Sequence, residues 1–412
     1  MKIFFSVGEP SGDLHGANLI NELKAHAAAR GEAWEFVGYG GPRMAAAGAQ
    51  LHADLTQLAI MWFLRVLLNL HKFIGLARQA EQYFVEHRPD AVVLIDYPGF
   101  NWHIARRAKK HGIPVFYYGT PQLWGWAGWR VKKMRRDVDH VLVKLPFEVA
   151  WYRERGCHAT HVGHPYFDEL ITQKLDDQFV SDQQQSAGPL VTILPGSRTQ
   201  EVKSNLRDQL KAAEKIAKRA PGVRFAIAGY KPSQRELIEA RLVESGLQHS
   251  GTPIEIHIGR APELIHASHC CLAVSGSVSL ELLYHAKPTA IIYRISPLAF
   301  WVQKQFRRVR YITLVNLLTA EELFPEDVGV YDANDPRDAH VLMPEYLTCE
   351  DRTSELADHV VQWLTDEAAY ADRRQALAEL RDRVGHGGAS KRAAEYLVQH
   401  LTQSQPADIA AA

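Results

Sequence analysis

The stretch SVGEPSGDLHGA, residues 6–17, decides how the fold of this 412-residue chain is read. It follows an apolar run, Ile3 to Val7, and precedes a helix-like pattern, which is where nucleotide-binding folds hold phosphate. Its glycines lack the G-x-G-x-x-G spacing of a dinucleotide site, and Glu9 and Asp13 would repel phosphate. The stretch therefore predicts a strand, a turn and a helix, with a turn that meets a hydroxyl-rich or otherwise different ligand.

Apolar runs with strand character alternate with helix-length segments along most of the chain. KIFFSV, DAVVLID and HVLVKL are examples from the first half, and LVTILPG, CCLAVSG and TAIIYR from the second. Strands this apolar are typical of parallel sheets covered by helices on both faces. We predict an α/β chain with two doubly wound, Rossmann-like domains, residues 1–170 and 189–345. A helical C-terminal segment, residues 350–403, is expected to pack back on the N-terminal domain or on a partner subunit.

Composition excludes several classes of function. Lys plus Arg and Asp plus Glu both number 47, so the whole protein has no field that would attract nucleic acid. The four cysteines form no C-x-x-C pair, which argues against a disulfide framework or a zinc site. The first apolar run is too short for a secretory signal, so we expect a cytoplasmic protein.

Two turns in the second half have the chemistry of a nucleotide diphosphate site. In LVTILPGSRTQEV a strand ends at Gly196, Ser197 and Arg198 before a helix, which combines backbone N–H groups with a guanidinium. The alternative is an ordinary strand-to-helix turn with a surface arginine. Ligands of doubly wound sheets bind beyond the carboxyl ends of the strands, so the site is expected in the cleft between the domains.

The second turn, in CCLAVSGSVSLE, contains Ser275, Gly276 and Ser277. Glu281 follows Ser277 by one helical turn, where its carboxylate could accept both hydroxyls of a ribose. A helix-surface acid is the alternative for Glu281. No G-x-x-x-x-G-K-[ST] sequence occurs, which argues against a P-loop ATPase.

Asp96 ends the very apolar strand DAVVLID and is followed by the turn Pro98-Gly99. A carboxylate there is a candidate general base, and a helix-capping aspartate is an equal alternative. The DVD sequence at 137–139 precedes a strand, which is the wrong end of a sheet for a metal site. We predict no metal and no cofactor.

Residues 57–84 form an unusually apolar helical pattern, interrupted by Arg65 and Asn69. The polar interruptions exclude a membrane span, so the helix is either sandwiched between layers or presents one face to acyl chains, a bilayer or a partner subunit. Basic clusters at 130–136 and 304–310 lie beside tryptophans, as at an anionic membrane interface, and ordinary solvated helix faces are the alternative. The predicted membrane or acyl contacts are Met61, Trp62, Phe63, Leu64, Leu67, Leu68, Arg130, Lys132 and Lys133.

The order of motifs resembles the lipid-A-disaccharide synthase family, which is glycosyltransferase family 19 with the two-domain GT-B fold. GEPSGD, IDYPGFN, PQLWGW, LPFE and VGHP are similar to the family's motifs in the first domain. LPGSR-x-x-EV, SGS-x-x-LE and NLL are similar to its donor-site motifs in the second. The stretch 329–347 looks inserted relative to the family.

The resemblance implies an inverting transfer of 2,3-diacylglucosamine from its UDP derivative to the 6-hydroxyl of 2,3-diacylglucosamine 1-phosphate. The products are the β-1,6 lipid A disaccharide 1-phosphate and UDP, and the enzyme associates with the cytoplasmic surface of the inner membrane. Pairing of subunits into a homodimer by exchange of C-terminal segments is also a property of the family. The implied site residues are Asp96 as base; Gly196, Ser197, Arg198, Ser275, Gly276, Ser277, Glu281 and Asn316 for UDP; and Glu9, Ser11, Gly12 and Asp13 for the acceptor.

Three other functions share parts of these patterns. One is the GT-B transferase that adds N-acetylglucosamine to a polyprenyl-linked peptidoglycan precursor. Another is a non-hydrolysing UDP-sugar 2-epimerase, whose reaction does not require an apolar membrane-contacting helix. The third is a non-catalytic lipid-binding relative, against which the joint presence of Asp96, Arg198 and Glu281 argues.

Overall fold

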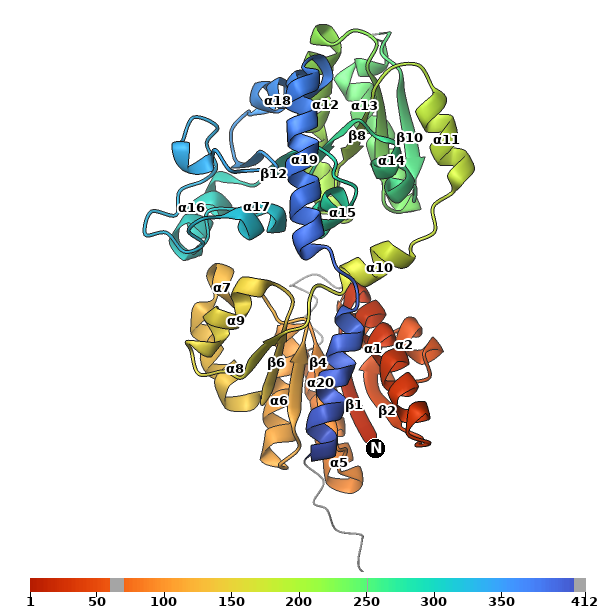
Figure 1. Ribbon diagram of the computed structural model, residues 1–412, viewed down its shortest axis with the longest axis vertical. Helices are drawn as coiled ribbons and strands as arrows, with labels where there is room; N and C mark the ends of the chain where they lie inside the picture. The colour runs from red at the N-terminus through yellow and green to blue at the C-terminus, as the bar shows by residue number, and fades with distance from the viewer. Residues whose placement is uncertain (60–69, 250, 404–412) are drawn as a thin grey trace, which may run out of the picture. The chain divides into compact units, whose positions relative to one another are not determined.

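The computed structural model describes residues 1–59, 70–249 and 251–403. The chain forms two compact units (Figure 1). Unit 1 consists of Met1–Asp168 and His386–Ala412, and unit 2 of Glu169–Gly385. Each unit has a parallel sheet with helices on both faces, which confirms the predicted class of two doubly wound, Rossmann-like domains.

The sheet of unit 1 has, among the described residues, seven parallel strands in the order β3-β2-β1-β4-β5-β6-β7. Its first strand is central and pairs with β2 on one side and β4 on the other. All residues of β4 are apolar and buried, and β1 is buried from Ile3 to Val7, as a doubly covered sheet requires. The strands are β1 Lys2–Val7, β2 Glu35–Gly40, β3 Gln50–Asp54, β4 Ala91–Ile95, β5 Val115–Tyr118, β6 His140–Val143 and β7 Ala159–His161.

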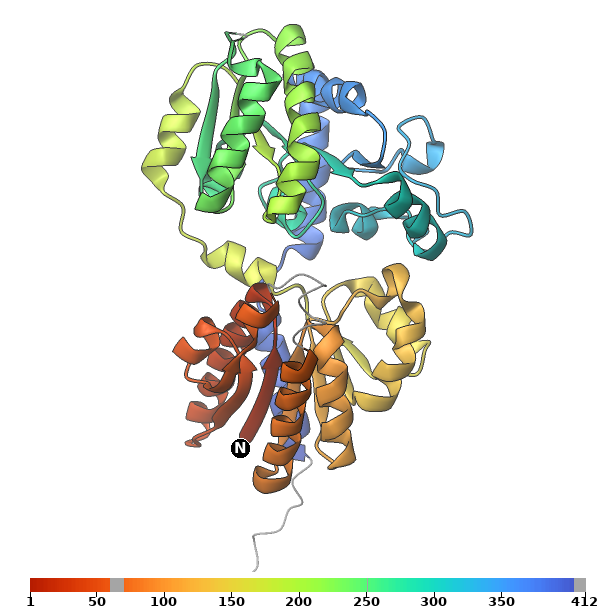
Figure 2. The same cartoon turned by 180° about the vertical axis from the view of Figure 1, so that it is seen from behind.

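Helices α1 (Pro10–Ala29) and α20 (Ala389–Gln403) cover one face of this sheet, and α5 (Leu70–His87) and α6 (Pro98–Lys110) cover the other (Figures 1 and 2). On the first face, Leu397 and Leu401 of α20 join the core beneath α1. The chain therefore completes the core of unit 1 with its last described helix.

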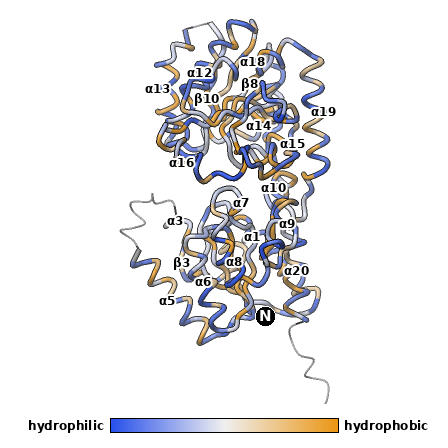
Figure 3. Tube along the Cα trace, turned by 90° about the vertical axis from the view of Figure 1, so that its left-hand side faces the viewer, coloured by the Kyte–Doolittle hydropathy of each residue, from blue (hydrophilic) through white to orange (hydrophobic). Residues whose placement is uncertain are grey.

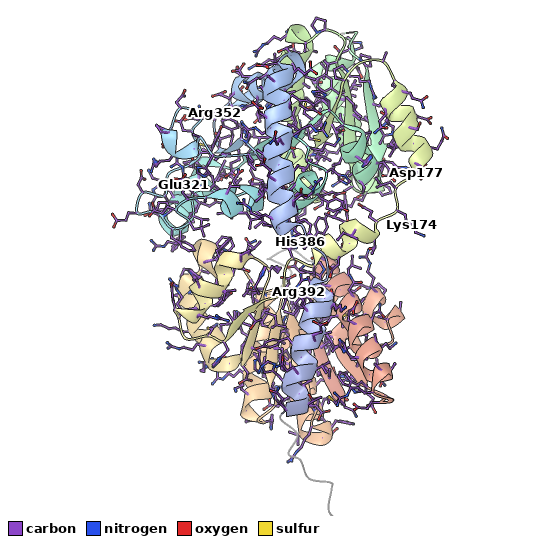
Figure 4. All side chains as sticks on the ribbon, viewed as in Figure 1. Lys174, Asp177, Glu321, Arg352, His386 and Arg392 are labelled. Carbon is purple, nitrogen blue, oxygen red and sulfur yellow. The ribbon has the colours of Figure 1, made fainter. Side chains whose placement is uncertain are left out.

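The N-terminus of α20 is fixed by hydrogen bonds from unit 1. The Asp168 carboxylate accepts backbone N–H bonds from Gly388, Ala389 and Ser390 at 2.5, 3.0 and 2.9 Å. These are orphan donors at the start of a helix, which a carboxylate satisfies well. Arg392 of α20, labelled in Figure 4, donates to the Val162 carbonyl at 2.8 Å.

The C-terminal segment expected over 350–403 divides between the units. Only α20 belongs to unit 1, whereas α18 (Thr353–Thr365) and α19 (Glu367–Val384) belong to unit 2. The reason is packing, because Leu356, Val360 and Trp363 of α18 are buried in the core of unit 2. The C-terminal segment therefore forms no separate layer: its first two helices belong to unit 2, and its last helix belongs to unit 1.

The sheet of unit 2 has six parallel strands among the described residues, in the order β10-β9-β8-β11-β12-β13. Helices α12 (Thr199–Arg219), α13 (Arg235–Ser245) and α18 pack on one face, and α14 (Ala261–Ala267) on the other. Figure 3 shows hydrophobic residues gathered in the interior of this unit around β8. The strands are β8 Leu190–Leu194, β9 Arg224–Gly229, β10 Ile254–Ile258, β11 Cys270–Ala273, β12 Thr289–Arg294 and β13 Glu345–Thr348.

The remaining described helices connect these elements. None of the described helices has the length and hydropathy needed to cross a bilayer. These connecting helices are α2 Pro42–Ala46, α3 Leu55–Ala59, α7 Leu123–Trp126, α8 Val131–Asp137, α9 Pro146–Arg153, α10 Tyr166–Thr172, α11 Asp177–Gln185, α15 Val278–Tyr284, α16 Pro297–Phe306 and α17 Leu314–Thr319.

The apolar helix predicted over 57–84 is described only in part. The structure gives α3 up to Ala59 and α5 from Leu70. The predicted lipid-contact residues Met61, Trp62, Phe63, Leu64, Leu67 and Leu68 lie outside the described residues.

Candidate functional site

Each sheet reverses its strand order at one point, and the predicted site residues follow the strands at that point. In unit 1, β1 and β4 are neighbours and the chain continues from them toward opposite edges. In unit 2, β8 and β11 have the same relationship. Such switch points leave a crevice beyond the carboxyl ends of the strands, where doubly wound folds bind ligands. The turns at Glu9 and Asp96 flank the first switch point, and the turns at Arg198 and Ser275 flank the second.

Asp96 lies directly after β4 in a strained backbone conformation. Asp96 and Tyr97 have φ angles of 45° and 44°, in the left-handed region that non-glycine residues rarely adopt. Two side chains hold this turn through the Asp96 carbonyl: Asn101 Nδ2 donates to it at 2.8 Å and the Tyr117 hydroxyl at 2.6 Å. The carboxylate itself stays partly exposed beyond the strand end.

Lys144, which follows β6, is the charged partner of Asp96. Its Nζ lies 3.4 Å from Asp96 Oδ1, and both side chains are largely buried. Burial disfavours the ammonium ion, but the carboxylates of Asp96 and Glu148 outweigh it, so the pKa of Lys144 is raised. Lys144 therefore remains a cation beside the candidate base.

Buried Glu148 fixes the backbone at Lys144. Its carboxylate accepts the N–H groups of Lys144 and Leu145 at 3.0 and 2.9 Å and the indole N–H of Trp124 at 2.8 Å. Burial raises the pKa of Glu148, while these three donors and the Lys144 charge oppose the shift. Lys144 and Glu148 were not singled out as site residues from the sequence, although Glu148 belongs to the quoted LPFE motif. The signal available for Lys144 was its place at the end of an apolar strand, as for Asp96.

His164 of the VGHP motif is buried in the same unit. Its Nδ1 accepts the Tyr166 N–H at 3.2 Å. Burial, and then the nearby charge of Lys144, hold the pKa of His164 well below its usual value. The imidazole is therefore neutral at physiological pH, with its proton on Nε2.

The GEPSGD turn is shaped by its glycines. A side chain at Gly8 would collide with the ring of Tyr97, so glycine lets the two turns at the switch point approach each other. A Cβ at Gly12 would lie 2.9 Å from Cγ1 of Val7, which keeps the first turn of α1 close to β1. Glu9 is partly buried just before α1, and Ser11 is exposed in its first turn.

Asp13, which was predicted to contact the acceptor sugar, has a structural role in this fold. Its buried carboxylate accepts backbone N–H bonds from Gly41, Arg43 and Met44 at 2.8, 3.0 and 3.1 Å. These donors belong to the start of α2, whose N-terminus Asp13 satisfies from another helix. The carboxylate is committed to the fold, which leaves Glu9 and Ser11 as the polar side chains of this turn that face outward.

In unit 2, the backbone of the 196–198 turn packs closely against the first turn of the helix that follows it. Gly196 has a φ of 117°, and a Cβ there would lie 2.6 Å from Cβ of Glu201. Gln234 Nε2 donates to the Ser197 carbonyl at 3.0 Å, a support that the sequence did not reveal. Ser197 and Arg198 are exposed before α12, and among the described residues the Arg198 guanidinium forms an ion pair only with Glu201, at 3.0 Å. An exposed guanidinium at a helix N-terminus is well placed to bind an anion.

The 275–277 turn follows β11, the neighbour of β8. The Ser275 hydroxyl donates to the Ile312 carbonyl at 2.8 Å, and Gly276 and Ser277 are exposed. Two turns at adjacent strand ends thus present small residues and backbone N–H groups at one switch point.

The two predicted nucleoside contacts are both buried. Glu281 lies on α15 with little exposure. Asn316 is fully buried, and its amide donates to Glu345 at 2.9 Å and to the Met343 carbonyl at 2.7 Å while accepting the Met343 N–H at 3.1 Å. Both amide hydrogens and the amide oxygen have partners within unit 2, so Asn316 supports the fold of this unit, and its contact with a nucleoside stays a prediction.

With these positions in hand, comparison with known proteins identifies the family. Residues 3–376 match the lipid-A-disaccharide synthetase family. The chain belongs to this family. A lipid-A-disaccharide synthase of Myxococcus xanthus is 32% identical over 401 residues, which cover 97% of each chain. One of Pseudomonas putida is 33% identical over 376 residues, or 91% of this chain and 97% of that one.

The architecture of this lipid-A-disaccharide synthetase family member is also found in solved structures. UDP-GlcNAc 2-epimerase from Neisseria meningitidis, bound to UDP-GlcNAc, has a TM-score of 0.61 at 13% identity and covers 98% of this chain and 100% of its own. CalG4, the calicheamicin glycosyltransferase, has a TM-score of 0.55 at 13% identity, covering 98% and 99%. At such identity these similarities concern the fold alone, and they agree with the predicted GT-B architecture.

The predicted membrane contacts Arg130, Lys132 and Lys133 lie on one segment of unit 1, around the start of α8. Lys132 and Lys133 of α8 are exposed, and the Arg130 guanidinium lies 5.1 Å from the ring centre of Trp126. Trp126 and Trp129 are 53% and 57% exposed. In the described part of the chain, no group of three or more His, Cys, Asp or Glu side chains is placed to hold a metal ion.

Proposed function

We propose that this chain transfers 2,3-diacylglucosamine from its UDP derivative to the 6-hydroxyl of 2,3-diacylglucosamine 1-phosphate. Membership of the lipid-A-disaccharide synthetase family over nearly the full chain supports an enzyme of lipid A disaccharide synthesis. The observation that carries the mechanism is the placement of Asp96 at the switch point of one sheet and of the Arg198 and Ser275 turns at the switch point of the other.

We propose that Asp96 is the general base. Its carboxylate lies at a strand end, is partly exposed and is held by a strained turn, which are the features of a positioned catalytic group. As the sugar oxygen attacks the anomeric carbon, Asp96 accepts the proton of the 6-hydroxyl. Lys144 fixes Oδ1 of Asp96 and keeps a positive charge next to the developing reaction centre.

Unit 2 is the proposed donor site. Inversion in one displacement needs no protein nucleophile, so the remaining task is to stabilise the departing UDP. Arg198 and the N–H groups of the 196–198 and 275–277 turns supply positive charge and donors to the diphosphate. Glu281 stays a proposed contact of the ribose, and Glu9 and Ser11 of the acceptor.

We also propose peripheral association with the cytoplasmic face of the inner membrane through Trp126, Trp129, Arg130, Lys132 and Lys133. Exposed indoles beside cations that form no ion pair with a described residue match the interfacial region of an anionic bilayer, where each Lys or Arg contributes about 1 kcal/mol.

The test uses purified protein with both lipid substrates in detergent, measuring UDP release and the disaccharide by mass spectrometry. Asp96→Asn should lower kcat by at least about 100-fold, because the proton acceptor is removed, and leave UDP binding unchanged. Arg198→Ala should weaken UDP binding in calorimetry, whereas Arg235→Ala, another exposed arginine of unit 2, should not. A wild-type protein that forms no disaccharide would contradict the transfer, and an unchanged rate in Asp96→Asn would contradict only the base.

A further inference from the structure

We propose that helix α16 of unit 2 is a second membrane-contact element, which inserts its apolar face into an anionic bilayer. The helix lies at the outer edge of unit 2, on the side opposite α11 (Figures 1 and 2). None of its residues is buried. The proposal is independent of the transfer reaction and of the surface at Trp126 and Trp129.

The exposed apolar residues of α16 form one face. Leu298, Trp301, Val302 and Phe306 are 72%, 61%, 41% and 50% exposed. Spacings of three and four residues place them on the same side of a helix, and the polar residue on this arc, Gln305, carries no charge. A face of this kind, with a tryptophan in its middle, is typical of helices that lie in the membrane interface.

The cations beside this face are of two kinds. Arg310 is buried and donates to Asp338 and Asp335 at 2.7 and 2.9 Å, and Arg307 donates to the Gly329 carbonyl, so these two support the fold. Lys304 and Arg308 are exposed, and no described residue forms an ion pair with either. The basic cluster at 304–310 therefore supplies two cations that are available to a partner.

A cavity at the base of α16 adds two more unpaired cations. It has a volume of about 890 Å³ and lies between the first turns of α12, the end of β12 and the start of α16. Lys203 and Arg207 line it without an ion-pair partner among the described residues, whereas Arg294 is held by Asp208 at 2.6 Å and Lys211 by Asp351 at 3.2 Å. Around the apolar face, Lys203, Arg207, Lys304 and Arg308 thus have no ion-pair partner among the described residues.

These features favour a bilayer over a second copy of the chain. The exposed apolar side chains of this face come from one ten-residue helix, whereas a stable protein interface takes about 20–30 residues from each partner. The chain has no net charge, so another copy offers no general excess of carboxylates to the four free cations. Anionic lipid supplies both the apolar phase and the opposite charge.

The test is vesicle flotation of the full chain without substrates. Leu298→Glu with Val302→Glu should reduce binding to vesicles of phosphatidylglycerol and phosphatidylcholine by at least about tenfold, since two charges would enter the apolar layer. Val243→Glu is the matched control, because Val243 is 59% exposed on α13 of the same unit. Lys304→Gln with Arg308→Gln should weaken binding to the anionic vesicles and leave the weak binding to phosphatidylcholine alone unchanged. Retained UDP binding shows that unit 2 is folded in each variant.

A second measurement places Trp301 itself. Brominated lipids should quench part of the tryptophan fluorescence of the wild type, and Trp301→Phe should lose that part while still binding vesicles. Unchanged flotation of the double glutamate variant, or quenching that is the same in Trp301→Phe, would overturn the proposal. So would a double variant that binds vesicles normally but dissociates a dimer or raises only the KM for the acylated substrates. Loss of transfer activity has no bearing on these readouts.

Discussion

At the scale of single residues, the site of unit 1 depends on side chains from several strand ends. Asp96 follows β4 and Lys144 follows β6, and the parallel sheet brings both to the same edge. Carboxyl ends of parallel strands share one edge, so the proposed base and a cation that are 48 positions apart become an ion pair.

Lys144→Met tests the role of this cation. We expect kcat/KM for disaccharide formation to fall by about 10- to 100-fold, because a fixed charge at the reaction centre is lost. Lys110→Met, which removes an exposed lysine of α6 that pairs with Glu81, should leave the rate unchanged. Equal rates in wild type and Lys144→Met would remove Lys144 from the site.

Asp13→Ala tests the structural role of the GEPSGD aspartate. Three N–H groups at the start of α2 would lose their acceptor, so we expect the free energy of unfolding to fall by about 2 kcal/mol. Urea denaturation measures the change. The substrate KM of the folded fraction should stay near the wild-type value, and a raised KM with normal stability would instead indicate contact with the acceptor.

At the scale of elements, α20 is attached to unit 1 partly through histidines. His140 of β6 stacks on Phe116 at 4.5 Å between ring centres, and its Nδ1 lies 3.0 Å from the Tyr396 hydroxyl of α20. Burial, with the nearby His400, lowers the pKa of His140 from 6.5 to about 4. The folded protein therefore keeps this imidazole neutral where the unfolded chain would protonate it.

This difference predicts a pH dependence of stability. Between about pH 6.5 and 4 the unfolded chain binds a proton that the folded chain does not, so lowering the pH should lower the stability of unit 1. In His140→Gln the slope of the thermal midpoint against pH should be smaller over this range. His249→Gln, at an exposed position of unit 2, should keep the wild-type slope. An identical slope in wild type and His140→Gln would contradict the assignment.

The stretch 329–347, which was predicted from the sequence to be an insertion, is a structural element of unit 2. Asp338 binds the Arg310 guanidinium and accepts the Tyr311 hydroxyl at 2.6 Å, and Glu345 accepts the N–H groups of Ile312 and Thr313 at 2.6 and 2.9 Å. The Ile312 carbonyl in turn accepts the Ser275 hydroxyl. The stretch therefore supports the turn proposed to hold the diphosphate.

At the scale of the whole molecule, unit 1 is discontinuous and unit 2 is continuous in sequence. Residues 386–403 supply Ala393, Ala394, Leu397 and Leu401 to the core of unit 1, whereas residues 169–385 form unit 2 without them.

Truncation after Gly385 should therefore affect the units differently. Loss of α20 uncovers the face of the unit 1 sheet beneath it, so we expect unit 1 to unfold at a lower temperature or fail to fold, with loss of transfer activity. Unit 2 should still bind UDP in calorimetry. A truncated protein with an unchanged calorimetric profile would show that α20 adds no stability to unit 1.

The sequence by itself determined the α/β class, the parallel sheets and the turns at Asp96, Arg198 and Ser275. Apolar strand periodicity and strand-to-helix turns are local properties, so a pattern along the chain reveals them. Only the tertiary structure decided which partners those turns have. In the structure, Asp13 accepts hydrogen bonds from the start of α2, and Asn316 is hydrogen-bonded to Glu345 and Met343. Asp96 forms an ion pair with Lys144. The structure also places only α20 of the C-terminal helices in unit 1. Such partners depend on which strands become neighbours and which helix faces are covered, and a local pattern along the chain does not reveal these long-range contacts.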